Sequence, residues 1–220
     1  MKIKFILLLT ASLFLQCKVD SQSWGTIKGE GDIVTKQIQL DPMHGVGLGI
    51  SGELILTQGS VQQVTIEGQQ NIIDNIKREV RDGFWSIEYI KNVREAKDVR
   101  IRITVPNLDE IGLSGSGSIT STNQFSGLDK LEMDISGSGG IQFDMEAKST
   151  ELNLSGSGKA DLKGTTGKFE INISGSGNVM ADDLKSSGCE VAISGSGDAS
   201  VQVNGDLEAA ISGSGDVVYS

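Results

Sequence analysis

The second half of the chain alternates apolar and polar positions with a period of two. Before each of six Ser-Gly-Ser-Gly motifs stand a glutamate, an apolar residue, a small or polar residue and a second apolar residue, as in EINISGSG at 170–177. A period of two is typical of a strand with one buried face. A second short apolar run follows each motif. Each unit therefore predicts two short strands joined by a Ser-Gly-Ser-Gly corner.

These units recur at a nearly constant spacing of 18 to 22 residues, with the motifs starting at Ser114, Ser136, Ser155, Ser174, Ser194 and Ser212. A flexible Gly/Ser linker has no reason to keep a period, whereas a period near twenty is typical of stacked repeats. One unit cannot bury its apolar face alone, but parallel stacking of consecutive units can. The sequence therefore predicts an all-β fold, a single-stranded right-handed parallel β-helix with coils of about 20 residues.

The glycines of the motif predict the shape of the corner. Glycine has no Cβ and adopts positive φ without strain, so it suits a tight bend between two faces. We expect at least one glycine of each motif to have a positive φ, at equivalent positions such as Gly137, Gly156 and Gly175.

The first half of the chain is less regular. Its patterns predict strands at 46–50, 53–57, 61–67, 84–90 and 99–105, and a short helix or extended loop at 71–80. Ile50-Ser51-Gly52 repeats the later motif 63 residues before Ser114, near three periods, so coils are expected before the regular repeats. The predicted β-helical domain spans 35–220, with irregular first coils at 35–110 and six regular coils at 111–220.

The N-terminus has the order of a secretory signal. Lys2 and Lys4 precede an apolar stretch at 5–16 that is too short to span a bilayer, so residues 1–16 are interpreted as a signal peptide. Cys17 follows at the position of the lipid-modified cysteine of bacterial lipoproteins, although Gln16 stands where that pattern prefers a small residue. The alternatives are lipidation of Cys17 and ordinary cleavage a few residues later. Both predict an exported protein, in the periplasm, outer membrane or cell surface, with a linker at 17–34.

The cysteine and charge content indicates whether the fold depends on disulfides and which classes of partner are expected. There are two cysteines, so a lipidated Cys17 would leave Cys189 without an intramolecular partner, and the fold does not depend on disulfides. The net charge is −10, and residues 106–220 hold six lysines, no arginine and seventeen acidic residues. Nucleic-acid binding needs a basic surface, so no nucleic-acid partner is expected. Contact with a membrane is expected only through an N-terminal lipid.

Catalytic motifs are scarce. The one histidine, His44, lies in the turn sequence DPMHG, and the sequence has no G-x-S-x-G motif, no phosphate loop and no His/Cys cluster with zinc spacing. The sequence therefore favours a protein that is not an enzyme and has no cofactor. The enzymatic alternative is a calcium-dependent polysaccharide lyase, because acidic β-helices include such enzymes. Its basic catalytic group on the regular coils would have to be a lysine.

Two sets of residues are candidate sites. Four residues before each motif stands a glutamate, and stacked carboxylates about 4.8 Å apart repel. We therefore expect this column to face solvent and to be offset by salt, nearby lysines or a divalent cation such as calcium; it comprises Glu110, Glu132, Glu151, Glu170, Glu190 and Glu208. Trp85 and Tyr89 share an expected strand, and either belong to the core or form a platform on which a sugar ring stacks.

The last unit ends in an apolar run at Val217–Tyr219, which we expect to form a strand at the open edge of the stack. Two arrangements would satisfy that edge. Either a loop from earlier in the chain covers it, or two molecules self-associate weakly through the last coil.

The order of the motifs resembles a known family. The segments ISGELILTQG, VTIEGQQNIIDNI, DGFWSIEY and ITVPNLDEIGLSGSG, followed by the repeats, are similar over 29–220 to the head GIN domain family, described as auto-transporter adhesins of Bacteroidetes-type bacteria. The resemblance implies a secreted or surface-attached β-helical protein and carries no catalytic residues. The leading interpretation is a non-enzymatic envelope protein that binds a glycan or another envelope molecule. The alternatives are a self-associating structural solenoid and the lyase.

Overall fold

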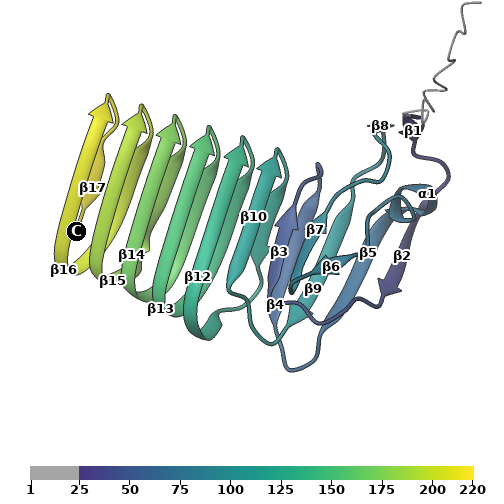
Figure 1. Ribbon diagram of the computed structural model, residues 1–220, viewed down its shortest axis with the longest axis horizontal. Coiled ribbons are helices and arrows are strands. Elements are labelled where there is room, and N and C mark those ends of the chain that lie inside the picture. The colour runs from purple at the N-terminus through teal and green to yellow at the C-terminus, as the bar shows by residue number, and fades with distance from the viewer. Residues whose placement is uncertain (1–24) are drawn as a thin grey trace, which may run out of the picture.

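The regular half of the protein is a stack of two-faced coils. The computed structural model describes residues 25–220, and its long bent strands are β12 (Phe125–Gly137), β13 (Gly140–Gly156), β14 (Lys159–Gly175), β15 (Asn178–Gly195) and β16 (Asp198–Gly213) (Figure 1). Neighbouring strands pair in parallel, with glutamate opposite glutamate and each motif opposite the next. The predicted all-β parallel solenoid with coils of about 20 residues is confirmed.

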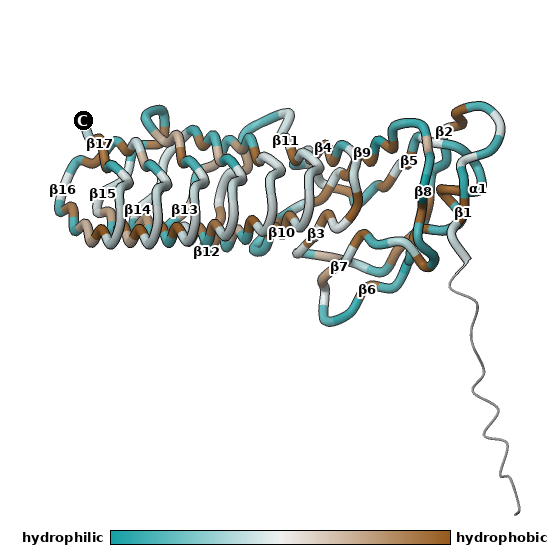
Figure 2. The backbone as a smooth tube through the Cα atoms, turned by 90° about the horizontal axis from the view of Figure 1, so that it is seen from above, coloured by the Kyte–Doolittle hydropathy of each residue, from teal (hydrophilic) through white to brown (hydrophobic). Residues whose placement is uncertain are grey.

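The two faces form separate rows when the stack is seen from above (Figure 2). We call the face that leads into the Ser-Gly-Ser-Gly corners the glutamate face. Towards the N-terminal end it continues through β10 (Glu110–Gly115), β3 (Gly45–Leu48), β7 (Phe84–Ile87) and β6 (Val80–Arg81). The opposite face continues through β11 (Ser118–Ser121), β4 (Glu53–Gln58), β9 (Arg100–Val105), β5 (Gln63–Gln69) and β2 (Ile33–Ile38).

The N-terminal end of the stack is closed by antiparallel strands. β5 pairs antiparallel with both β9 and β2, and the four-residue helix α1 (Gln70–Ile73) follows β5. β1 (Ile27–Lys28) and β8 (Val93–Glu95) form a separate two-stranded sheet. The strands predicted in the first half are confirmed within a few residues, and the segment 71–80 contains the end of α1 and the start of β6. No helix in residues 25–220 has the length and apolar character needed to cross a bilayer.

The coils of the first half do not stack in chain order. β3 lies between β7 and β10, and β4 lies between β9 and β11, so the coil at 45–58 rests directly on the first regular coil. Leu48 pairs with Leu113, and Ser51 Oγ lies 3.4 Å from Ser116 Oγ. The expected alignment of Ser51 with Ser114 is therefore wrong by two residues. The residues between these two coils, 59–109, form a further coil on the far side of β3 and β4. The spacing from Ser51 to Ser116 is therefore not a multiple of the repeat length.

The core is built from columns of like residues. The apolar residue just before each motif points inward, and Leu113, Ile135, Leu154, Ile173 and Ile193 are all buried. At the bend opposite the motif, Thr150 Oγ1 and Thr166 Oγ1 lie 3.0 Å apart, and Thr166 Oγ1 also lies 3.2 Å from the Lys168 carbonyl oxygen, to which it can donate. Burial of each large apolar side chain stabilises the fold by roughly 1.5–3 kcal/mol. Stacking thus supplies the core that a single thin coil lacks.

The corners confirm the expectation for glycine. The first glycine of every motif has a φ between +106° and +139°: Gly115, Gly137, Gly156, Gly175, Gly195 and Gly213. These glycines are also pressed together along the stack. A Cβ added to Gly156 would lie 2.7 Å from the carbonyl oxygen of Gly137. The corner therefore needs glycine both for its backbone conformation and for the close approach of the next coil.

The C-terminal end of the stack is open within residues 25–220. β17 (Val217–Tyr219) pairs with Ala199–Val201 of β16, which confirms the expected terminal strand. Val218 and Tyr219 are strongly exposed. No segment in the described part of the chain covers this edge, so the expected shielding loop is not found there.

We predict that Gly156→Val destabilises the protein by about 1–2 kcal/mol or more, because valine at positive φ is strained and its Cβ meets the coil below. The midpoint of urea unfolding measures the effect. Gly140→Ala is the matched control, since φ is not positive there and the nearest atom to an added Cβ is 3.7 Å away. Equal stability of the valine variant and the wild type would contradict the role of the corner.

Candidate functional site

The outer surface of the glutamate face carries three columns of side chains. The serines that begin the motifs form one column, and the glutamates form another. Between them lies a column of small side chains, which changes along the stack from Asp134 to Asn153 and Asn172, and then to Ala192 and Ala210. Because these middle side chains are small, the sheet is hollowed between the two flanking columns.

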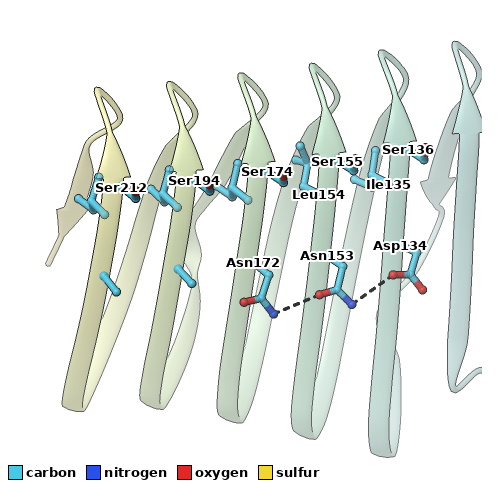
Figure 3. A pocket seen from close by; sticks show the side chains of 15 residues that line it. Asp134, Ile135, Ser136, Asn153, Leu154, Ser155, Asn172, Ser174, Ser194 and Ser212 are labelled. Carbon is cyan, nitrogen blue, oxygen red and sulfur yellow. Dashed lines mark hydrogen bonds between the residues drawn. The ribbon is translucent and has the colours of Figure 1, made fainter.

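This hollow is a groove of about 650 Å³ that crosses five coils (Figure 3). At about 4.8 Å per strand, the first and last of these coils are roughly 19 Å apart. The serine column forms one wall, and Asp134 is the only charged residue in the lining. The complete lining is Asp134, Ile135, Ser136, Asn153, Leu154, Ser155, Asn172, Ile173, Ser174, Ala192, Ile193, Ser194, Ala210, Ile211 and Ser212.

A chain of amide hydrogen bonds gives the groove a direction. Asn172 Nδ2 donates to Asn153 Oδ1 at 3.1 Å, and Asn153 Nδ2 donates to Asp134 Oδ1 at 3.2 Å (Figure 3). Both amides thus direct their donors towards Asp134. Within residues 25–220 no donor reaches Asn172 Oδ1, and the next two coils offer alanine. The groove therefore passes from a polar end at Asp134 to an apolar end at Ala210.

A smaller hollow of about 200 Å³ continues the groove towards the N-terminal end, since the two share Asp134 and Ser136. Phe84 lies on this outer surface, over the glycines of β3. A Cβ added to Gly47 would lie 2.8 Å from Phe84 Cζ, so the ring occupies the space that a side chain on β3 would fill. Phe84 is half-exposed.

Two roles were open for Trp85 and Tyr89, a place in the core and a platform on which a sugar ring stacks. Trp85 is fully buried, and its Nε1 donates to the Lys77 carbonyl at 3.0 Å. Tyr89 is half-buried against the core, and this burial raises the pKa of its hydroxyl. Trp85 therefore takes the first of these roles, in the core, and no ligand can reach its ring. Strict alternation along β7 places Phe84 outside once Trp85 is inside, and that pattern could have identified it.

The six glutamates stack in register along the glutamate face and are exposed or half-buried. Lys130 and Lys168 each stand two positions before a glutamate of this column, and each lies between the glutamates of two successive coils. Lys130 Nζ is 3.1 Å from Glu132 and 2.9 Å from Glu151, and Lys168 Nζ is 3.3 Å from Glu170 and 3.6 Å from Glu190. A lysine on every second coil thus bridges its own glutamate and that of the next coil.

These contacts shift the pKa values of the groups involved. The hydrogen bond from Lys130 lowers the pKa of Glu151. Glu110 lies one coil before the first bridged pair, and burial, with a smaller contribution from the charge of Glu132, raises its pKa. Within the described residues no group of three or more His, Cys, Asp or Glu side chains is placed to hold a metal ion. The expected compensation by nearby lysines is found for four of the six glutamates: Glu132, Glu151, Glu170 and Glu190.

The remaining candidate residues lie apart from the groove. His44 Nδ1 is 2.8 Å from Asp109 Oδ1 at the exposed turn where the sequence placed it. Cys189 is buried, and burial raises the pKa of its thiol to about 11. Cys17 lies outside the described residues, as does the predicted signal peptide.

Comparison with known proteins gives the family. The family described as "Putative auto-transporter adhesin, head GIN domain" matches residues 43–220, which is most of the chain. The chain belongs to the head GIN domain family. No curated protein matches this member of the family.

Solved structures show the same fold as this head GIN domain. A "putative adhesin" from Bacteroides fragilis has a TM-score of 0.77 and 21% identity, and the match covers 88% of this chain and 100% of that one. A "putative lipid binding protein" from Parabacteroides distasonis has a TM-score of 0.70 and 20% identity, over 89% of this chain and 100% of that one. A "putative adhesin" from Parabacteroides merdae has a TM-score of 0.64 and 15% identity, over 89% and 99%.

We predict that Lys130→Gln lowers the melting temperature at about pH 7 but not at about pH 2. A lowered carboxyl pKa contributes stability above the ordinary value of 4.5, and this contribution is lost as the pH falls through the folded-state value. Below that value Glu151 is protonated, and its ion pair with Lys130 is lost. Thermal melts at the two pH values measure the difference. The control is Lys159→Gln, which removes a lysine that forms no ion pair among residues 25–220; an equal effect of both substitutions would contradict the bridge.

Proposed function

We propose that the protein is an exported, non-enzymatic binding protein of the adhesin kind, which holds an elongated, uncharged ligand in the groove of the glutamate face. The observation that carries this proposal is a continuous groove across five coils, lined by hydroxyl, amide and methyl groups and by one carboxylate. A repeating surface of this kind suits a repeating or extended ligand. The membership in a family described as adhesins supports the same function.

A glycan chain is the ligand class that we favour. The serine hydroxyls can donate and accept hydrogen bonds, and the serine column repeats at every coil, so successive sugar hydroxyls would find successive partners. Asn172 Oδ1 offers an acceptor in the middle of the groove. The apolar face of a sugar ring could rest against Phe84 or on the alanines of the last two coils.

Charge argues against anionic ligands. The glutamate column runs beside the groove on the same face, and residues 106–220 hold eleven more acidic than basic residues. This field repels nucleic acids and also the acidic polysaccharides that lyases cleave. The lyase alternative therefore loses support, and a neutral ligand is favoured.

A lipid is the second candidate ligand. The apolar end of the groove, formed by Ala192, Ala210 and the half-exposed Ile211, could hold an acyl chain. One of the solved structures with this fold is described as a "putative lipid binding protein", which makes this candidate worth testing.

Export and anchoring rest on the N-terminal sequence. The basic residues, the apolar stretch at 5–16 and Cys17 support export, with the lipid on Cys17 as the membrane anchor. We predict that labelled palmitate is incorporated into the wild-type protein and not into Cys17→Ala. Equal labelling, or no labelling of the wild type, would contradict the anchor.

We predict that Ala192→Phe blocks ligand binding by at least about tenfold, because a ring at this exposed position fills the groove. Ser187→Phe is the matched control, on an exposed position of β15 outside the groove. A glycan array and neutral phosphatidylcholine vesicles serve as the two probes. Array binding lost in Ala192→Phe and kept in Ser187→Phe supports the glycan, and the same pattern on vesicles supports the lipid. Binding to either probe that survives Ala192→Phe would contradict the groove.

A further inference from the structure

The last coil exposes a strand edge that every earlier coil covers. Residues 206–213 of β16 pair with β15 on one side, and no strand pairs with them on the other within residues 25–220. β17 covers only the other end of β16, on the opposite face. The backbone N–H and C=O groups along 206–213 therefore include a row that is free to pair with an added strand.

The same coil also exposes the inward side of its apolar columns. Leu207, Ala209 and Ile211 continue the columns of Cys189, Val191 and Ile193, which are buried. Ile211 is 45% exposed, whereas Ile193, one coil earlier, is 2% exposed. An added strand with apolar residues at alternate positions would cover these side chains as each coil covers the one before it.

The alternation of lysines along the stack is broken at this edge. The position two residues before the column glutamate is occupied in turn by Lys130, Ser149, Lys168, Gly188 and Asp206. Each lysine bridges two glutamates, and the alternation would place a third lysine at 206. An aspartate stands there instead. Within residues 25–220, neither Asp206 nor Glu208 forms an ion pair.

We propose that this end is a docking edge for an extended peptide segment from another protein, with apolar residues at alternate positions and a lysine or arginine near Asp206 and Glu208. Main-chain hydrogen bonds to 206–213 would supply affinity, and the apolar columns and the two carboxylates would supply selectivity. This edge shares Ala210, Ile211 and Ser212 with the end of the groove. It would bind an added strand through backbone groups at the end of the stack and not a ligand on the outer surface, so the inference goes beyond the proposed function.

Charge favours such a segment over a second copy of this chain. Two copies meeting end to end would bring two acidic last coils together, each with Asp198, Asp206, Glu208 and Asp216, and the chain has no basic residue after Lys185. Surfaces with the same sign of charge repel when they are brought together. The weak self-association expected from the sequence is therefore the outcome that the acidic edge disfavours.

The regular coils supply a probe for this edge. The segment 168–179, KFEINISGSGNV, carries the lysine, the alternating strand and the corner of the fourth coil. We predict that a fluorescent peptide of this sequence binds the exported protein saturably and that salt weakens the binding. A control peptide with glutamate in place of the lysine is expected to bind at least about tenfold more weakly, because its added carboxylate faces Asp206 and Glu208.

Substitutions in the protein locate the site. Asp206→Lys should reverse the preference between the two peptides, and Ile211→Asp should abolish binding of both. Met180→Asp is the control, because Met180 is also 45% exposed but lies on the outside of the opposite face. Circular dichroism checks that each variant stays folded, and a charge reversal at 206 tests the edge even if Ile211→Asp unfolds the last coil.

Three results would overturn the inference. Absence of peptide binding would mean that the carboxylates of Asp206 and Glu208 prevent the addition of a strand at this edge. Equal binding of the two peptides would remove the role of charge. Sedimentation showing a dimer of the wild type that Ile211→Asp dissociates would assign the edge to a second copy.

Discussion

The vertical register of the coils is the constraint on which the rest of the structure depends. At each corner a glycine with positive φ lies above another, and an added Cβ at Gly137, Gly156 or Gly175 would meet the backbone of the previous corner at 2.5–2.7 Å. A coil that slipped by one residue would place a serine in this contact and reverse the inward and outward sides of its strands. The corners thus act as fixed joints, and the Ser-Gly-Ser-Gly repeats are not flexible linkers.

Register turns each position of the repeat into a column of like chemistry. Where the column is apolar, stacking builds the core, and where the side chains are small, stacking hollows the groove. Where the column is acidic, stacking brings carboxylates together, and Lys130 and Lys168 bridge them on alternate coils. The open edge is the place where apolar column, acidic column and strand pairing all stop without a neighbour.

The sequence predicts most of the regular half, because period, alternation and corner glycines are local signals that agree with one another. It does not predict that the coil at 45–58 rests on 110–121, since that pairing joins segments 65 residues apart. The groove also cannot be predicted from the sequence, because its depth depends on small residues in five different coils. Phe84 and Trp85 are neighbours in sequence, and the orientation of β7 determines which of the two side chains faces outward, where a ligand can reach it.

Distances between spin labels along one corner column test the stacking most directly. Ser51, Ser116 and Ser214 are exposed and belong to one column, and the buried Cys189, whose thiol pKa is raised to about 11, stays unlabelled. Labels at Ser116 and Ser214 are five coils apart, so double electron–electron resonance should give a narrow distribution near ~24 Å. Labels at Ser51 and Ser214 should add one coil, about 5 Å, in spite of the 65 residues between Ser51 and Ser116. Broad distributions, or a Ser51–Ser214 distance longer by several coils, would contradict a single in-register stack.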